Sequence, residues 1–225
     1  MYHKLSNKLR ISFKDRNLLI GAFVHRSYLN EHPEKKISSN ERLEFLGDAV
    51  LELLASDFLY QKFPNLPEGK LTSLRSKLVC DYSLSKIAKK LELGNYLLLS
   101  HGEEESGGRK NSSLLGNVFE ALLGAIYLDQ GLSTVKKFLD IHLFPTIEEA
   151  KKHRDYKSDF QEIAQEKFKI TPVYKILEEV GPDHAKTFTV NAYLDKKLWG
   201  KGMGRSKQEA EQAAAQKALQ KISKA

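Results

Sequence analysis

Residues 40–50 have the sequence Asn40-Glu41-Arg42-Leu43-Glu44-Phe45-Leu46-Gly47-Asp48-Ala49-Val50, which predicts a helix that carries acids among core side chains. The apolar residues recur at the spacing of a helix that packs against a core. The acids at 41, 44, 48 and 52 fall within a narrow arc of one helix face, at about 100° per residue. Because Glu44 and Asp48 are like charges at i, i+4, we expect a positively charged group beside them.

We expect this helix to begin at a cap among Ser38, Ser39 and Asn40 and to end near Phe63, before Pro64. The helix dipole favours acids in the first turn, which explains Glu41 and in part Glu44. It does not explain Asp48 or Glu52, because they lie beyond that turn. Glu52 is expected to face solvent or an ion-pair partner.

A second run, Leu114 to Leu128, is apolar on every side apart from Asn117 and Glu120. It therefore predicts a central helix packed all round. A carboxylate within such a helix has to be neutral, paired or metal-bound, because a lone buried charge costs several kcal/mol. Asn117 shares the face of Glu120, three residues earlier.

Two hypotheses account for these inward-facing oxygens. The first is a metal site for Mg²⁺, with Mn²⁺ as a substitute, since clusters of oxygen ligands suit these ions and not zinc. Its ligands would be Glu44, Asp48, Asn117 and Glu120. The second is a set of buried salt bridges to Arg42, Arg75 or Lys77. We favour the metal site, because unpaired acids are rarely buried.

The remaining helices of the N-terminal part read as ordinary core helices. One is expected from Pro67 onward, another is capped by Asp81, and a later one runs from Ser133 to about Ile147. Residues 100–113 predict a surface loop. Its Gly107, Gly108 and Arg109 offer exposed amides and a cation to a phosphate, although this signal is weak on its own.

The pattern changes after residue 149, where a polar and charged stretch predicts a linker over 150–156. The expected domains are an all-α domain over 1–149 and a small α+β domain over 157–225. The order in the second is helix, three strands, helix (α-β-β-β-α). The strands are predicted at 172–179, 187–194 and 198–203, with a hairpin at 195–197 between the last two.

The net charge of +7 lies mostly in the last third of the chain. Residues 151–225 hold 16 Lys and Arg against 10 Asp and Glu, whereas residues 1–150 hold 20 against 19. Such an excess fits either nucleic-acid binding or a solvated surface. Arg205, Ser206 and Lys207 lie at the start of the last helix, predicted over 207–222, where helix amides and two cations form a phosphate clamp.

Composition excludes several classes of protein. The chain has 225 residues and 41% hydrophobic content, and no apolar run reaches the roughly 18 residues of a membrane span. Its N-terminus shows no apolar signal stretch, so we expect a cytoplasmic protein with no membrane partner. Cys80 is the single cysteine, which excludes an internal disulfide and a cysteine-based zinc cluster.

Two segments resemble a known family. Residues 40–50 are similar to the signature of bacterial ribonuclease III, and Phe119-Glu120-Ala121-Leu122-Leu123-Gly124-Ala125-Ile126-Tyr127-Leu128-Asp129 resembles its second helix. The C-terminal part resembles a double-stranded-RNA-binding domain through Gly181-Pro182-Asp183-His184 and Ser206-Lys207-Gln208-Glu209-Ala210-Glu211-Gln212-Ala213-Ala214. The resemblance covers essentially the whole chain.

The resemblance implies a homodimeric endoribonuclease that cuts double-stranded RNA by Mg²⁺-dependent phosphodiester hydrolysis. Its products would carry 5′ phosphates and short 3′ overhangs, and its substrates would be rRNA and other structured precursors. Carried over by position, Glu44, Asp48 and Glu120 match metal-binding carboxylates, with Asp48 and Glu120 as the catalytic pair. Glu41 and Glu68 match acids that line the cleft between subunits.

The resemblance assigns further roles at the dimer and on the RNA. Phe45 resembles an aromatic knob that enters a socket on the partner subunit. The residues expected to contact RNA are Gln161, Glu162, His184, Arg205, Ser206 and Lys207. A-form RNA is recognised by shape, through 2′-hydroxyls and phosphates, which a basic domain of this kind can contact without reading bases.

The chain departs from the family pattern at Asn117, where aspartate is usual. An amide oxygen can bind a metal, but it brings no charge and cannot act as a base. We favour retained cleavage, because the other three acids are intact. The alternative is a cleavage-impaired double-stranded-RNA-binding dimer, and a DNA-binding protein is a third hypothesis. A smaller departure is Gln208, where the RNA-binding motif usually has lysine.

Overall fold

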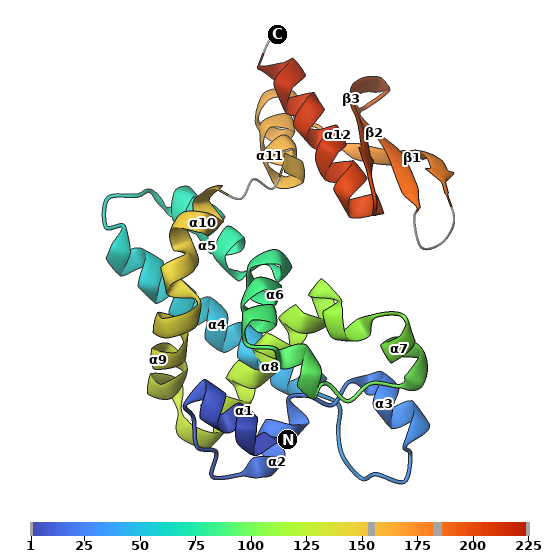
Figure 1. Ribbon diagram of the computed structural model, residues 1–225. Helices are drawn as coiled ribbons and strands as arrows, with labels where there is room; N and C mark the ends of the chain where they lie inside the picture. The colour runs from blue at the N-terminus through green and yellow to red at the C-terminus, as the bar shows by residue number, and fades with distance from the viewer. Residues whose placement is uncertain (1, 153–155, 182–185, 224–225) are drawn as a thin grey trace. The chain divides into compact units, whose positions relative to one another are not determined.

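The computed structural model describes residues 2–152, 156–181 and 186–223, and the chain divides into two compact units, Met1–Lys152 and His153–Ala225 (Figure 1). The first unit is helical and the second is a helix, three strands and a helix. This confirms the predicted fold class. None of the helices in the described part of the chain combines the length and the hydrophobicity needed to span a bilayer.

The first unit consists of α-helices joined by short 3-10 turns. In chain order they are α1 (Tyr2–Leu9), α2 (Arg16–Gly21), α3 (Arg26–Glu31), α4 (Glu41–Lys62), α5 (Glu68–Val79), α6 (Asp81–Lys90), η1 (Leu93–Tyr96), α7 (His101–Glu105), η2 (Gly108–Lys110), α8 (Ser112–Gln130), α9 (Leu132–His142), η3 (Phe144–Thr146) and α10 (Ile147–Lys152).

Helix α8 is the centre of this unit. Residues 121–126 are buried without interruption, as its all-round apolar sequence predicts. The helix makes its most extensive contacts with α4 and also packs against α6, α9 and α2. The predicted extent of α4 is confirmed: it ends at Lys62, just before Phe63 and Pro64.

Several local predictions were wrong. Residues 100–113 are not an open loop, because Ser100 caps α7 and η2 follows it. The helix expected from Ser133 to Ile147 is interrupted by η3 at Pro145, whose ring cannot continue an α-helix. Residues 150–152 of the predicted linker form the last turn of α10, and Ala150 is buried there.

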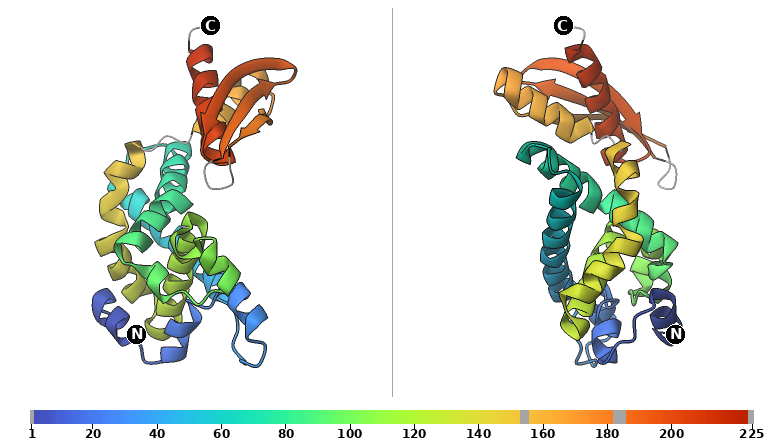
Figure 2. Two further views of the ribbon diagram at one scale, coloured as in Figure 1. Left: turned by 45° about the vertical axis from the view of Figure 1, so that its right-hand side comes forward. Right: turned by 90° about the vertical axis from the view of Figure 1, so that its left-hand side faces the viewer.

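The second unit pairs two helices with a three-stranded antiparallel sheet. Its elements are α11 (Tyr156–Phe168), β1 (Val173–Val180), β2 (Thr187–Leu194), β3 (Lys197–Gly204) and α12 (Lys207–Ile222), with strand order β1-β2-β3. Its core joins both helices to one face of the sheet (Figure 2). A Cβ on Gly200 would lie 2.1 Å from the Ala214 carbonyl oxygen, so glycine lets α12 lie directly on β3.

Candidate functional site

A close crossing of α4 and α8 brings together acids that are far apart in sequence. A Cβ on Gly47 would lie 1.8 Å from the carbonyl oxygen of Glu120, and one on Gly124 would lie 2.2 Å from that of Leu43. Only glycine fits at such a contact. Since Glu44 and Asp48 flank Gly47, the crossing carries both to the part of α8 that holds Glu120. We call Glu44, Asp48 and Glu120 the acidic cluster.

The acidic cluster is strongly self-repelling. Burial and, to a smaller extent, the carboxylates of Asp48, Glu44, Asp81 and Glu52 together raise the pKa of Glu120 to about 8. The pKa of Glu44 is also raised, first by burial and then by neighbouring carboxylates, of which Glu41 has the largest effect. Near neutral pH the site therefore favours either a bound proton or a cation.

No basic side chain neutralises the acidic cluster. Across residues 2–152, its carboxylates take part in no ion pair or hydrogen bond with a side chain. Arg75 is engaged elsewhere, since its Nε lies 2.6 Å from Oε2 of Glu52 and its guanidinium donates to Ser56. The salt-bridge hypothesis is therefore wrong for these three acids, and the expected ion-pair partner of Glu52 is confirmed.

Asn117 lies on α8 one turn before Glu120 and is partly exposed. Together with the acidic cluster it offers only hard oxygen donors, the chemistry that Mg²⁺ and Mn²⁺ prefer. Within the described residues, no three His, Cys, Asp or Glu side chains are already gathered at metal-binding distance. The donors therefore fit such an ion by chemistry and charge, and a cation would have to draw the carboxylates together.

Asp81 is an acid near the site whose role the sequence did not predict. It was expected to cap α6, but Cys80 occupies the cap position and no side chain makes a capping hydrogen bond there. Instead, Oδ1 of Asp81 lies 3.3 Å from the position of a Cβ on Gly116, beside Asn117. Gly116 is the one sequence feature that indicates this contact, because glycine leaves room for the carboxylate. It could be interpreted only once α6 was known to pack on α8.

The predicted cleft acids lie near the two ends of α4, with Glu41 one turn before Glu44 of the acidic cluster. Glu41 accepts a hydrogen bond from Ser39 at the start of α4. Glu68 begins α5, accepts one from Thr72, and lines a pocket beside the far end of α4. Both side chains are exposed in the single chain.

Of the predicted phosphate contacts at residues 107–109, that of Arg109 is not supported by the geometry. Gly107 is exposed, but Gly108 is buried. The Arg109 guanidinium donates to both carboxylate oxygens of Glu104 and to the carbonyls of Gly94 and Leu97. The Arg109 guanidinium therefore holds this segment together through hydrogen bonds within the helical unit.

The second unit presents its predicted RNA contacts on two helices. Gln161 and Glu162 are exposed on α11. Ser206 caps α12 by accepting a hydrogen bond from the amide of Glu209. Arg205 and Lys207 flank this cap and are exposed. His184 lies outside the described residues.

Lys207 has a partner of opposite charge in the same unit. Its Nζ lies 3.3 Å from Oε1 of Glu179 on β1 and 5.7 Å from the centre of the Phe188 ring. The ion pair is exposed, and an exposed ion pair contributes at most about 1 kcal/mol. The ammonium can therefore exchange Glu179 for another anion at little cost.

Comparisons with known proteins agree with this division into two units. Residues 15–147 match the Ribonuclease-III-like family, and residues 156–222 match the double-stranded RNA binding motif. Ribonuclease 3 of Enterococcus faecalis is 50% identical over 97% of this chain and 96% of its own length. Ribonuclease 3 of Geobacillus kaustophilus is 51% identical over 98% of this chain and 91% of its own.

A solved structure matches the helical unit. The nuclease domain of ribonuclease III from Campylobacter jejuni superimposes with a TM-score of 0.58 and is 42% identical to this chain. The match covers 67% of this chain and 98% of that domain.

Proposed function

This chain belongs to the ribonuclease III family and is an endoribonuclease that acts on double-stranded RNA, and we propose that it cuts by Mg²⁺-dependent hydrolysis at the acidic cluster of Glu44, Asp48 and Glu120. The observation that carries the proposal is the meeting of α4 and α8 at Gly47. It places the half-buried carboxylates of Glu44 and Glu120 beside the exposed Asp48, without a neutralising base among residues 2–152.

When bound, Mg²⁺ would supply Lewis acidity, which activates a water for attack on the phosphate and stabilises the departing 3′ oxygen. Glu44, Asp48 and Glu120 would hold the ion, with Asp48 and Glu120 closest to the chemistry, and Mn²⁺ could take its place. Asn117 contributes an amide oxygen. Since it has no charge, it weakens the hold on the ion without removing a ligand.

We propose that the active form is a homodimer built on α4. Three large side chains on this helix are exposed in the single chain: Phe45 by 79%, Tyr60 by 73% and Leu53 by 57%. These three side chains fall on one face of α4, and large apolar side chains exposed along one face form an apolar stripe that is typical of a protein interface. The similar nuclease domain from Campylobacter jejuni is described as having a region involved in dimer formation.

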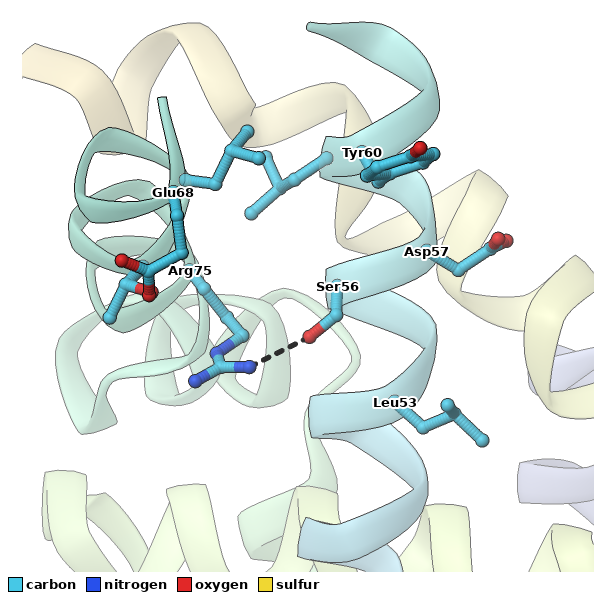
Figure 3. A pocket seen from close by; sticks show the side chains of 9 residues that line it. Leu53, Ser56, Asp57, Tyr60, Glu68 and Arg75 are labelled. Atoms are coloured by element: carbon cyan, nitrogen blue, oxygen red, sulfur yellow. Dashed lines mark hydrogen bonds between the residues drawn. The ribbon is translucent and has the colours of Figure 1, made fainter. Parts of the chain in front are cut away.

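A pocket beside this stripe supports a socket for Phe45. Leu53, Asp57 and Tyr60 line it from α4, while Glu68 and Arg75 line it from α5 (Figure 3). Its volume of about 470 Å³ leaves ample room for a phenyl ring.

A two-fold axis near the middle of α4 would pair this helix with its copy in antiparallel directions. Residue 45 of each subunit would then lie opposite residue 60 of the other, which brings Phe45 to the pocket of the partner. The same pairing would bring Glu41 and Glu44 toward Glu68 of the partner subunit. We therefore propose that Glu41 and Glu68 line a cleft shared by the two subunits.

The second unit would hold the duplex. We propose that Gln161 and Glu162 on α11, together with His184, contact minor grooves, and that Arg205, Ser206 and Lys207 grip phosphates at the start of α12. Ser206 accepts from the amide of Glu209, and the Glu209 carboxylate accepts from the amide of Arg205. The amides between them have no partner within the helix, and these favour an anion. Gly107 and Gly108 stay proposed backbone contacts, whereas the bonds of Arg109 favour a role within its own segment.

The finer features of the activity are also proposals. The family resemblance implies products with 5′ phosphates and short 3′ overhangs, and each subunit of the dimer would cut one strand. The substrates would be rRNA and other structured precursors. These are made in the cytoplasm, where we propose that the protein acts.

A second candidate function is a double-stranded-RNA-binding dimer with impaired cleavage. The observation that favours it is Asn117, which removes one anionic ligand from the site. Cleavage requires Mg²⁺, whereas binding of RNA by the second unit does not, and this separates the two candidate functions.

Glu120→Gln separates binding from cutting. The wild type and the variant are incubated with a long RNA duplex, in Mg²⁺ or in EDTA, and tested for cleavage and for a gel shift. We expect the wild type to release 5′-phosphate duplexes only in Mg²⁺, and the variant to bind the duplex equally well without cutting it. Loss of binding in the variant would show that Glu120 is structural, and cleavage in EDTA would contradict the metal mechanism.

A further inference from the structure

Asp81 approaches the acidic cluster from a third helix. It is the first residue of α6, which packs against α8. Its Oδ1 lies 3.3 Å from the position of a Cβ on Gly116, and its Cα lies 3.7 Å from the same point. Gly116 directly precedes Asn117 and is four residues before Glu120, so it shares a helix face with Glu120. The carboxylate of Asp81 therefore lies against α8 at Gly116, on the helix face that also carries Glu120.

The side chain of Asp81 is exposed, and no contact within α6 fixes its carboxylate. It makes no capping hydrogen bond in α6, whose cap position belongs to Cys80. Among the described residues it accepts no hydrogen bond and forms no ion pair. The dipole of α6 favours an acid in the first turn by only about 0.5 kcal/mol, and it does not require that the side chain face α8.

The electrostatics agree with the geometry. The carboxylate of Asp81 contributes to the raised pKa of both Glu120 and Glu44, although burial is the larger cause in each case. A negative charge at this position adds to the repulsion in the acidic cluster as long as no cation is present. The same charge attracts a cation that binds there.

We propose that Asp81 supplies, beside Asn117, the negative charge that Asn117 lacks, and that it is a positioning residue for the divalent cation of this chain. The inference rests on the proposed metal site. Asp81 acts through its charge, while Glu44, Asp48, Asn117 and Glu120 provide the ligands. Four carboxylates then face the ion, although one of the four ligands is an amide.

The test is the affinity of the whole chain for Mn²⁺, measured by electron paramagnetic resonance in the absence of RNA, so that cleavage plays no part. Asp81→Asn keeps the size of the side chain and removes the charge, and we expect it to weaken binding about tenfold. Asp81→Glu restores the charge and should bind within about twofold of the wild type. The matched control is Asp140→Asn, which removes an exposed acid from α9 and should leave the affinity unchanged.

A double variant tests the connection to Asn117. In the Asn117→Asp background the ligand charge is restored. Asp81→Asn should therefore reduce the affinity for Mn²⁺ clearly less in this background than in the wild type. Thermal melting in EDTA checks folding, and we expect Asp81→Asn to melt within a few degrees of the wild type.

Three results would overturn the inference. If the wild type and Asp81→Asn bind Mn²⁺ equally, Asp81 does not act on the ion, although the metal site stands. If Asp81→Asn unfolds in EDTA, its role is structural. If the wild type itself binds no Mn²⁺, the metal site and the inference both fail.

Discussion

Glu120→Gln should stabilise the metal-free protein in alkaline solution and leave its stability in acid nearly unchanged. The reason is the pKa of Glu120, which burial and neighbouring carboxylates raise from 4.5 to about 8. Folded protein keeps this proton up to about pH 8, whereas the unfolded chain releases it near pH 4.5. Between these values the folded state binds more protons, so the free energy of unfolding falls as the pH rises.

The shift of the pKa sets the size of the effect. At 1.36 kcal/mol per unit, the full shift corresponds to about 5 kcal/mol. Because the carboxylate is only half-buried, solvent screening lowers this to about 2 kcal/mol. Glutamine is neutral at every pH, so the variant does not pay the free energy of ionising residue 120 in the folded protein. We therefore expect it to be about 2 kcal/mol more stable than the wild type at pH 8 and nearly equal at pH 4.5.

Urea unfolding followed by circular dichroism measures the difference, with EDTA present and both proteins studied at pH 4.5 and pH 8. Added Mg²⁺ should reverse the order at pH 8, because an ion that binds only the folded wild type stabilises it alone. A variant that is less stable than the wild type at pH 8 without metal would refute the reasoning. So would a difference that does not change with pH.

Three further changes test the dimer, the helix crossing and the RNA clamp. Phe45→Ala should raise the dimer dissociation constant about a thousandfold, as measured by sedimentation equilibrium. The dimer loses two buried rings, and each contributes about 2 kcal/mol. Ile141→Ala, an exposed control on α9, should not change it. Gly124→Ala should destabilise the chain by about 2 kcal/mol in urea, whereas Gly102→Ala, with open space around it, should not. Lys207→Ala should weaken binding to all RNA duplexes alike and lower the slope of log affinity against log salt by about one; a change limited to particular sequences would contradict a phosphate contact.

Periodicity predicted the elements that consist of one long pattern. The extents of α4, β2 and α12 follow from the spacing of their apolar residues and from Pro64, and the structure confirms them. The conflict between charge and burial on α4 and α8 is also visible in the sequence, because a carboxylate at position 120 of an apolar helix needs a partner wherever that helix lies.

The sequence was misleading where a tertiary contact decides the outcome. Arg109 reads as an exposed cation in a glycine-bearing loop, yet carbonyls at Gly94 and Leu97 lie close enough to bind it. Asp81 reads as a helix cap, and only the approach of α6 to Gly116 reveals what it faces. Neither contact has a signature in the local sequence, because each joins residues whose separation is set by the packing of helices.

The most direct test of the account is single-turnover cleavage of a long RNA duplex by the wild type and by Asn117→Asp over a range of Mg²⁺ concentrations. We expect both proteins to cut, and the wild type to need a higher concentration of Mg²⁺ because its amide ligand carries no charge. Cleavage by Asn117→Asp alone, with tight binding but no cutting by the wild type at any Mg²⁺ concentration, would contradict it.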